Sequence, residues 1–492
     1  MNLLLLQPTD VLFFRDGRPM TLGLAGHGAA WPLPNITSAA LHAALWRSGC
    51  ETDVHPHRRG RNGQYSQDPA HRDRKFGSLL QAGPFPVRVK PENPAAPDAA
   101  TTATPDIGTW FFPRPADVQA RENPSELQTI LRPSDPPEQW TPGERSSLPA
   151  PLRYATVSCQ PPTKKTLPVR WLGTAEYERY LGETTPGLAV PLPPKAALAD
   201  TAIFHSEYTV GIGIDPATAT QDGKRIYSAH YLRLRDEFRL GIATEAHDKD
   251  FPQHGGDLIK ALFNGDPARI VVGGQQRICT VRRFDAGPLP FPRGVTTFAR
   301  QAHGKCRVKW VLLSPALWPE IPPKKKDGTL QNAHPGGWLP NWVFLDWDPA
   351  KLEAKPNARN GEVQLTSGPG LRKAERKNTK AGETIHARLV AAIVPKPIVV
   401  TGWALANGSA AKPDAGAKST HLAVPAGAVY YFETQDGLTG TAEEQAAALA
   451  NALNWHGGDT TFTTIKNRRS TLMGEKGFGL GVCGAWDFYA AH

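Results

Sequence analysis

The chain has 492 residues, of which 40% are hydrophobic and 21% charged, a balance typical of folded globular proteins and not of disordered ones. Lys and Arg number 56 against 46 Asp and Glu, so the formal net charge of +10 suits an anionic partner such as nucleic acid. The length exceeds one ordinary hydrophobic core and predicts about two or three domains.

Cysteine usage and hydropathy exclude several other classes of protein. The five cysteines form no CxxC pair and are odd in number, so neither a zinc site nor a disulfide framework is indicated. The apolar start at Met1 to Leu6 lacks the basic region of a signal peptide, and no apolar run is long enough to cross a membrane. We therefore expect a cytoplasmic protein without metal, cofactor or membrane partner.

The first predicted element is a strand at Leu3 to Leu6, whose unbroken apolar run is typical of a strand buried on both faces. The tight-turn dipeptide Asp16-Gly17 follows and would project Arg15 and Arg18 from one loop beside Phe13 and Phe14. Two interpretations remain open. The arginines are solvated beside a core aromatic pair, or the group forms a platform for a single-stranded nucleotide.

A glycine-rich connection, Gly23 to Gly28, then carries His27 and leads to a helix from Asn35 or Thr37 to about Ser48. His27 has the chemistry of a general base for RNA cleavage, but a lone histidine is more often a structural or contact residue.

Long polar insertions separate the remaining elements of this half. Residues 50–75 form a basic loop, either solvated or in contact with an RNA backbone, and residues 90–165 are rich in proline. Strands are predicted over 203–214 and 225–242, and a short helix over 255–262. A further strand over 268–281 contains Gly273-Gly274, which suggests a bulge or the close approach of another backbone.

The same order of elements then recurs. A strong strand is predicted over 306–316, a turn feeding a strand over 336–344, a polar insertion over 351–380, and strands over 398–403 and 426–432. The capping box Thr441-Ala442-Glu443-Glu444 predicts a helix that runs to about Trp455.

A glycine-rich loop, residues 474–484, comes after this helix and before a closing strand at Ala485 to Tyr489. Gly479-x-Gly481-x-x-Gly484 fits the dinucleotide-binding pattern, but that pattern needs a following helix in a βαβ unit. The eight residues after Gly484 leave no room for one, so a Rossmann site is excluded.

Each half thus begins with an apolar strand, passes through insertions and a helix, and ends with a glycine-bearing segment and a strand. The order predicts an α+β protein of two tandem ferredoxin-like (RRM-like) domains, at 1–290 and 300–492.

Several motifs, in order along the chain, resemble the subunit-3 family of type III-B CRISPR effector (Cmr) complexes, within the RAMP superfamily. The motifs lie at residues 8–19, 31–34, 112–117, 207–212, 227–233, 273–277, 313–316, 402–403, 423–432 and 477–479. The set covers essentially the whole chain. One departure is Gln275-Gln276, where the family often has an acidic residue and glycine.

The resemblance implies a non-catalytic, RNA-binding subunit of an antiviral ribonucleoprotein. Such a subunit binds the 5′ handle of the CRISPR RNA and contacts the large polymerase-bearing signature subunit and the backbone RAMP subunits, with target RNA reached only indirectly. Two alternatives remain open: a metal-independent RAMP endoribonuclease that uses His27, and a handle-binding subunit of a type I or type III-D complex.

The predicted RNA-contact residues combine positive charge, aromatic rings and glycine backbone, which can meet phosphates and splayed bases. They are Arg15, Arg18, His27, Arg277, Arg468, Arg469, Lys476, Gly477, Phe478 and Gly479. No catalytic residue is predicted.

Overall fold

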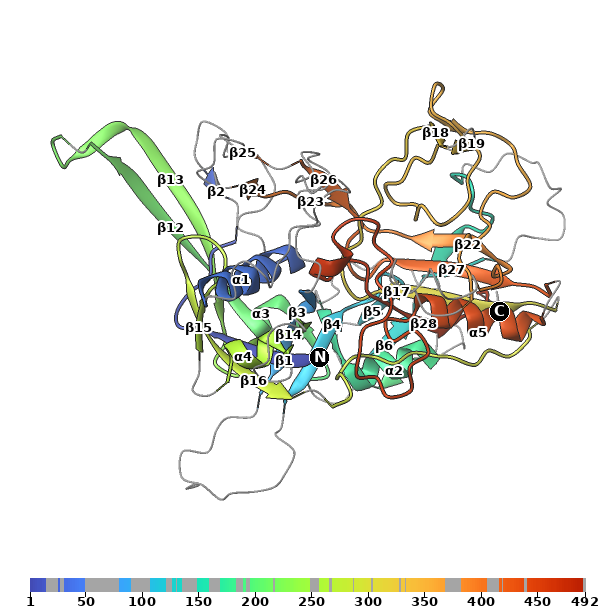
Figure 1. The fold of residues 1–492 in the computed structure, drawn as a ribbon, viewed down its shortest axis with the longest axis horizontal. Coiled ribbons are helices and arrows are strands. Elements are labelled where there is room, and N and C mark those ends of the chain that lie inside the picture. Colours follow the sequence, from blue (N-terminus) through green and yellow to red (C-terminus); the bar gives the residue numbers. More distant parts are fainter. Residues whose placement is uncertain are drawn as a thin grey trace, which may run out of the picture.

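The computed structural model shows a mixed α/β protein, rich in antiparallel strands, with two principal sheets (Figure 1). It describes residues 1–14, 25–26, 31–48, 79–89, 107–120, 126–129, 131–134, 148–158, 169–182, 189–191, 195–215, 217–247, 256–264, 268–285, 287–301, 304–326, 329–331, 333–367, 382–404, 416–417, 419–437 and 440–489. None of the helices in these ranges is long and apolar enough to cross a membrane.

The first principal sheet has eight strands in the order β11-β9-β4-β3-β14-β1-β16-β15. In chain order these are β1 (Asn2–Pro8), β3 (Leu80–Arg88), β4 (Thr109–Pro113), β9 (Val169–Gly173), β11 (Ala197–Ala199), β14 (Phe238–Glu245), β15 (Ala268–Val271) and β16 (Ile278–Asp285). The central strand β1 pairs antiparallel with β14 on one side and β16 on the other.

The second principal sheet has four antiparallel strands in the order β22-β27-β17-β28. They are β17 (Cys306–Leu312), β22 (Ala387–Ile393), β27 (Val429–Thr434) and β28 (Gly481–Ala485). When these strands are numbered in chain order, their order across the sheet is 2-3-1-4, and β3-β14-β1-β16 of the first sheet repeat that order.

Helices cover one face of each principal sheet. On the first sheet these are α1 (Pro34–Arg47), α3 (Asp200–Ile203) and α4 (Leu258–Leu262), and on the second α5 (Ala442–Leu453). Helix α2 (Thr174–Gly182) instead packs into the core between the two sheets. Leu4 and Leu6 of β1 pack with α1 and α4 in one buried cluster, whereas Val308 and Trp310 of β17 pack with α5 in another. The predicted capping box of α5 is confirmed, with Thr441 and Glu444 each bonding the other's backbone amide.

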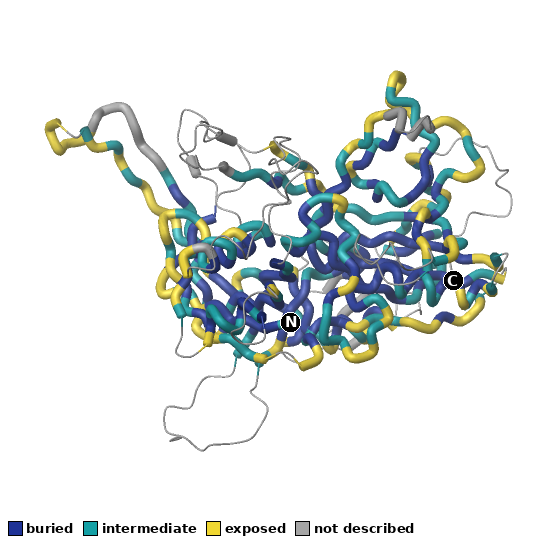
Figure 2. Tube along the Cα trace, in the orientation of Figure 1, coloured by how far each residue is buried: buried dark blue, intermediate teal, exposed yellow. Residues whose placement is uncertain are grey.

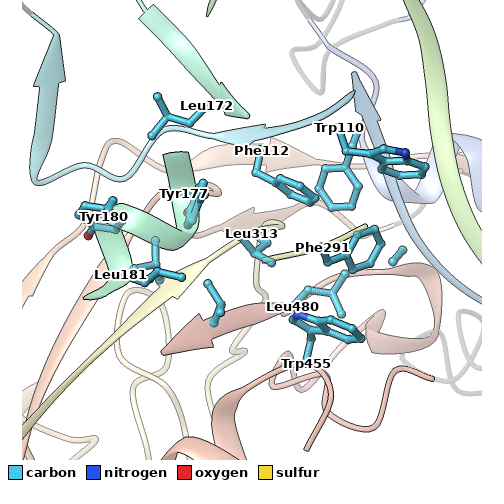
Figure 3. Close-up of a cluster of buried hydrophobic side chains, with 14 of the residues drawn as sticks. Trp110, Phe112, Leu172, Tyr177, Tyr180, Leu181, Phe291, Leu313, Trp455 and Leu480 are labelled. Atoms are coloured by element: carbon cyan, nitrogen blue, oxygen red, sulfur yellow. The ribbon is translucent and has the colours of Figure 1, made fainter. Parts of the chain in front are cut away.

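The opposite faces of the two sheets share one hydrophobic core, in which Leu3 and Leu5 of β1 belong to the same cluster as Val311 of β17. Aromatic rings fill it, as Figure 3 shows for Trp110, Phe112, Phe291 and others. Residues of this core are among the most deeply buried in the molecule, which Figure 2 displays as a dark interior. The alternation of Leu3 to Leu6 between two cores confirms the prediction of a strand buried on both faces.

A buried polar cluster lies within this shared core. The carboxylate of Asp117, in the first half, accepts hydrogen bonds from the hydroxyls of Tyr180 at 2.8 Å and Tyr431 at 3.1 Å. Burial, with the negative charge of Asp117 nearby, raises the pKa of both tyrosines well above the usual value, so both hydroxyls remain donors. The ammonium group of Lys309, from β17, lies 3.8 Å from the centre of the Tyr180 ring.

Several smaller sheets accompany the two principal ones. They comprise β10 (Ala189–Pro191), β6 (Glu126–Thr129) and β5 (Val118–Ala120); β12 (Phe204–Ile214), β13 (Gln221–Leu234) and β2 (Ala25–Gly26); and the pairs β7 (Leu131–Pro133) and β8 (Thr156–Ser158), β18 (Lys324–Lys326) and β19 (Thr329–Gln331), β20 (Trp347–Asp348) and β21 (Glu353–Ala354), β23 (Ile398–Val400) and β26 (His421–Ala423), and β24 (Trp403–Ala404) and β25 (Gly416–Ala417). The long hairpin β12–β13 extends away from the body as an arm (Figure 1).

Three predicted strands that precede the glycine-rich loop need correction. The stretch 268–281 is a hairpin of β15 and β16, with Gly273-Gly274 in its turn, because Val272 and Arg277 close that turn with a 2.8 Å backbone bond. The stretch 336–344 holds turns and a single bridge between Val343 and Val363. The stretch 225–242 is interrupted by a turn at 235–237 between β13 and β14.

We predict that Asp117→Ala lowers the free energy of unfolding by about 3 kcal/mol, because it leaves two buried hydroxyls without their acceptor. Tyr431→Phe removes one donor and keeps the ring, so it should cost only about 1 kcal/mol. Urea denaturation of the two variants, compared with the wild type, measures both effects. An Asp117→Ala variant as stable as Tyr431→Phe would show that the cluster contributes little.

Candidate nucleic-acid interface

The glycine-rich loop is shorter than predicted, since its last residues form strand β28 (Gly481–Ala485). The predicted closing strand at 485–489 is therefore wrong by four residues. The reason is close packing across the sheet: a side chain at Gly481 would overlap the Trp310 indole, and one at Gly484 would lie 2.6 Å from the Leu181 carbonyl oxygen. Glycine is required there by the core.

The remaining loop, residues 473–480, turns sharply on three left-handed residues: Met473, Gly477 and Gly479 have φ of 57°, 97° and 78°. A 3₁₀ turn, η5 (Gly474–Lys476), lies between the first two. The left-handed region favours glycine, which explains two of the glycines by local backbone conformation.

The backbone amides of this loop are occupied within the protein. Those of Lys476 and Phe478 donate to Met473, that of Gly477 to Gly474, and that of Gly479 to Pro315 at 2.7 Å. The amide of Leu480 donates to the Ser314 hydroxyl at 2.9 Å. Five consecutive amides are thus engaged, so a backbone cradle for phosphate over 476–480 is not present in this conformation.

Phe478 also requires a correction. Its ring is 0% exposed and packs with Leu317, Val400 and Met473 in a small core beneath the loop. A buried ring cannot stack on a nucleobase, so the aromatic contact expected of Phe478 is not available here.

The three predicted contact cations in and before the loop have different surroundings. Arg469 donates from Nε to the carbonyl oxygen of Ala452 at 2.6 Å, in the last turn of α5, where a cation stabilises the helix end. Arg468 is half-buried and donates to the Ile465 carbonyl at 3.4 Å. Lys476 is half-buried and is held through its carbonyl oxygen, which accepts from Gln81 at 3.0 Å.

Gln81 joins the loop to the first half. Its buried amide nitrogen donates to the carbonyl oxygens of Lys476 and of Pro34, the first residue of α1. A Cβ on Gly477 would lie 3.0 Å from the Gln81 carbonyl oxygen and 3.4 Å from Pro34. The loop of the second half is therefore docked onto α1 and β3 of the first.

Arg277 lies elsewhere, at the base of the arm. Its guanidinium group lies 5.0 Å from the centre of the Tyr231 ring and 3.6 Å from a carboxylate oxygen of Asp10, and it donates to Gln275. Tyr231 also contacts Phe13, with ring centres 5.5 Å apart. The side chain of Arg277 is 29% exposed, so it is both a structural contact of the arm and partly open to solvent.

Arg15, Arg18 and His27 lie outside the described residues. Two described segments next to them in the chain contact the β15–β16 turn and the arm. Phe14 packs against Gly273, and β2 (Ala25–Gly26) pairs with β13 of the arm through Ser228 and Ala229. The predicted residues that the structure describes thus divide into Arg277, at the base of the arm, and a loop group around Lys476.

Sequence reasoning missed the residues that position these groups. Asp10, Tyr231 and Gln81 were not predicted, because each acts across a long stretch of chain that single-sequence patterns do not reveal. A signal did exist for the arm: two long alternating segments, 204–214 and 221–234, flank residues 215–220, which include Asp, Pro and Thr and are typical of a turn.

The family model for the CRISPR-associated protein Cas_Cmr3 matches residues 4–486, nearly the whole chain. The chain belongs to this family. This confirms the resemblance drawn from the ordered motifs, and the arm and the loop are features of a Cas_Cmr3 protein.

Other comparisons are more distant. A search among curated proteins gives no match. Two solved structures, both of Type III-B Cmr-beta bound to cognate target RNA, one of them with AMPPnP, show 13% identity and a TM-score of 0.35, covering 87% of this chain and 86% of theirs. A Csm3–Csm4 subcomplex of a type III-A CRISPR-Cas interference complex shows 9% identity and a TM-score of 0.31, covering 89% of this chain and 93% of its own.

We predict that Arg469→Ala lowers stability by about 1 kcal/mol, because the helix end at Ala452 loses its cationic donor. Lys476→Ala keeps the backbone carbonyl that binds Gln81, so it should change stability by less than half as much. Thermal denaturation of the two variants tests the difference. Equal losses would contradict the division of roles between the two cations.

Proposed function

We propose that the chain is a non-catalytic subunit of a type III-B CRISPR effector complex that binds the 5′ handle of the CRISPR RNA. The observation that carries the proposal is membership of the Cas_Cmr3 family across residues 4–486. The net charge of +10 supports it, since RNA binding draws most of its affinity from phosphate neutralisation.

The geometry favours side chains over backbone as the RNA contacts of the loop. With the amides of residues 476–480 engaged, the Lys476 and Arg468 side chains are the groups that can meet phosphates there. Arg277 would supply a second contact at the arm base, and Arg15, Arg18 and His27, which lie outside the described residues, remain proposed contacts from the sequence. The loop adjoins the start of α1, since a side chain at Gly477 would lie 3.4 Å from Pro34.

We also propose that the chain bridges the large signature subunit and the backbone subunits, and that it consists of two ferredoxin-like domains, 1–290 and 300–492. Support for the domain proposal comes from the strand order, because β3-β14-β1-β16 and β22-β27-β17-β28 both run 2-3-1-4 in an antiparallel sheet. That is the order of a split βαβ fold. In the second half the residues between β17 and β22 hold turns and short strands at the place of the first helix, over the ranges described.

Handle binding predicts a specific salt dependence. Lys476→Ala and Arg468→Ala should each weaken binding of a handle RNA several-fold and reduce the slope of log K against log salt by about 0.7, the value for one single-strand phosphate contact. Filter binding over a range of salt concentrations measures both. Lys260→Ala, on α4, is the control and should bind as the wild type does. Unchanged binding in both loop variants would remove the loop from the interface.

The absence of catalysis is tested with repeat RNA in the presence of a chelator. We expect the purified chain to bind this RNA without cutting it. Site-specific cleavage that disappears in His27→Ala would establish the endoribonuclease alternative instead. The CRISPR type is tested by mass spectrometry and RNA sequencing of the natively purified assembly, where a signature subunit of type I or III-D would contradict the type III-B assignment.

A further inference from the structure

A buried amide lies where the two halves of the chain meet beneath the glycine-rich loop. Gln81 of β3 is 0% exposed and is paired with Thr244 of β14 in the first sheet. An apolar side chain could fill this position without taking polar atoms out of water. The presence of an amide here therefore needs a physical reason.

The amide nitrogen of Gln81 lies within hydrogen-bond distance of oxygens from two separate segments. It donates to the carbonyl oxygen of Pro34 and the hydroxyl of Thr37 in α1, and to the carbonyl oxygen of Lys476 in the loop. The last two distances are both 3.0 Å. The Thr37 hydroxyl donates in turn to Pro34, so it acts as an acceptor towards Gln81. One side chain thus connects the start of α1 with the loop of the second half.

The orientation of this amide is determined by those three oxygens. A flipped amide would point its own oxygen at the carbonyl oxygens of Pro34 and Lys476, which would repel it. In the orientation observed, the amide oxygen of Gln81 is buried and has no hydrogen-bond partner among the described residues. A buried acceptor without a donor lowers stability, so the position is not optimised for stability alone.

The loop itself behaves as one piece. The backbone amide of Arg469 donates to the carbonyl oxygen of Gly479 at 2.8 Å, which joins the two ends of the segment 468–479. A Cβ at Gly474 would lie 3.4 Å from the Cβ of Arg468, so the 3₁₀ turn packs against that residue. A contact that moves one part of this segment will therefore move the rest.

Close packing makes up the remainder of the seam towards the first half. A Cβ at Gly477 would lie 3.0 Å from the Gln81 carbonyl oxygen and 3.4 Å from the Cα of Ala82. Leu33, just before α1, packs against the small core beneath the loop. Apolar packing is non-directional and does not by itself fix how the loop is aligned with α1. The hydrogen bond from Gln81 to Lys476 supplies that direction.

We propose that Gln81 is a positioning residue for RNA binding. Its amide fixes the loop against the start of α1, so that the loop cations Lys476 and Arg468 and the contact residues of the first half meet one RNA strand at a constant spacing. This role rests on the proposed handle-binding function. Gln81 is buried and acts through the loop, and a loop held in place before the RNA arrives lowers the entropic cost of binding.

Gln81→Met tests the proposal, because it removes the donor and the orphaned oxygen while keeping an unbranched side chain of similar size. Such volume-conserving changes are tolerated in folded cores, and thermal denaturation checks that the variant is folded. We expect filter binding to show about tenfold weaker binding of a handle RNA, the loss that follows when a preorganised site becomes loose. Binding within twofold of the wild type would overturn the proposal.

Gln445→Met is the matched control. Gln445 lies in the first turns of α5, is 7% exposed, and accepts a hydrogen bond from the backbone amide of His386 at 2.8 Å. The same chemical change is thus made in a buried glutamine at the end of α5 that is distant from Ala452 and the loop. We expect handle binding within twofold of the wild type. A loss equal to that of Gln81→Met would assign the effect to general weakening of the fold and overturn the positioning role.

A combined variant distinguishes positioning from an effect that bypasses the loop. If Gln81 acts through the loop cations, Gln81→Met should cost no more than about twofold once Lys476→Ala and Arg468→Ala are already in place, because contacts that act as one unit are not additive. A full tenfold further loss in this background would show that Gln81 acts elsewhere and would contradict the proposal.

Hydrogen exchange tests the docking of the loop without RNA. We expect the amides of residues 476–480 to exchange at least tenfold faster in Gln81→Met than in the wild type, with exchange in β17 unchanged. Unaltered exchange in the loop would overturn the proposal whatever the RNA result.

The outcomes separate this proposal from the proposed function. A wild-type chain that does not bind handle RNA contradicts the proposed function, and the role of Gln81 in binding fails with it, while faster loop exchange in the variant would still establish Gln81 as the residue that docks the loop. A wild-type chain that binds, with Gln81→Met binding equally well, overturns the positioning role alone.

Discussion

The structure depends on the hydrophobic core that the two principal sheets share. Leu3 and Leu5 from the first sheet and Val311 and Val482 from the second belong to one buried cluster. Hydrophobic packing alone does not orient the two sheets. The hydrogen bonds of Asp117 do, because its two tyrosine donors come from different halves of the chain. Burial of an anion is tolerated only where hydrogen bonds compensate for lost hydration, so the cluster favours one relative placement of the two sheets.

This packing determines which surfaces are left for RNA. Many RNA-binding domains with a four-stranded sheet stack bases on aromatic residues of the open sheet face. Here the aromatic residues on those faces, Phe85, Phe112 and Tyr431 among them, are buried between the sheets, and helices cover the opposite faces. An RNA partner is left with loops, sheet edges and the arm. The two groups of predicted contact residues lie in such places, at the loop beside α1 and at the base of the arm.

The sequence was informative where one local pattern determined the structure. The run Leu3 to Leu6 and the capping box at Thr441 each predicted an element that the structure confirms, because their causes lie within a few residues. Predictions failed where the deciding contact was distant. The sequence predicts a single strand over 268–281, whereas the structure has a turn there at Gly273 and Gly274, which pack against Phe13. The sequence predicts an RNA contact for Phe478, whereas Leu317 and Val400 bury its ring. The RNA-contact assignments of Arg277, Arg468 and Lys476 remain predictions.

The glycines near the C-terminus show how one composition can have two physical causes. Glycine density next to Lys and Arg is typical of a phosphate-binding loop, since it exposes amides and permits close approach. The same residues can be required by packing alone, and the two cases differ in where the amides point. In this chain a side chain at Gly481 would overlap the Trp310 indole, and one at Gly477 would lie close to the Gln81 backbone. The backbone amides of residues 476–480 donate to oxygens of the protein itself. The glycines therefore join the two halves of the chain, and their density alone does not indicate a phosphate-binding loop.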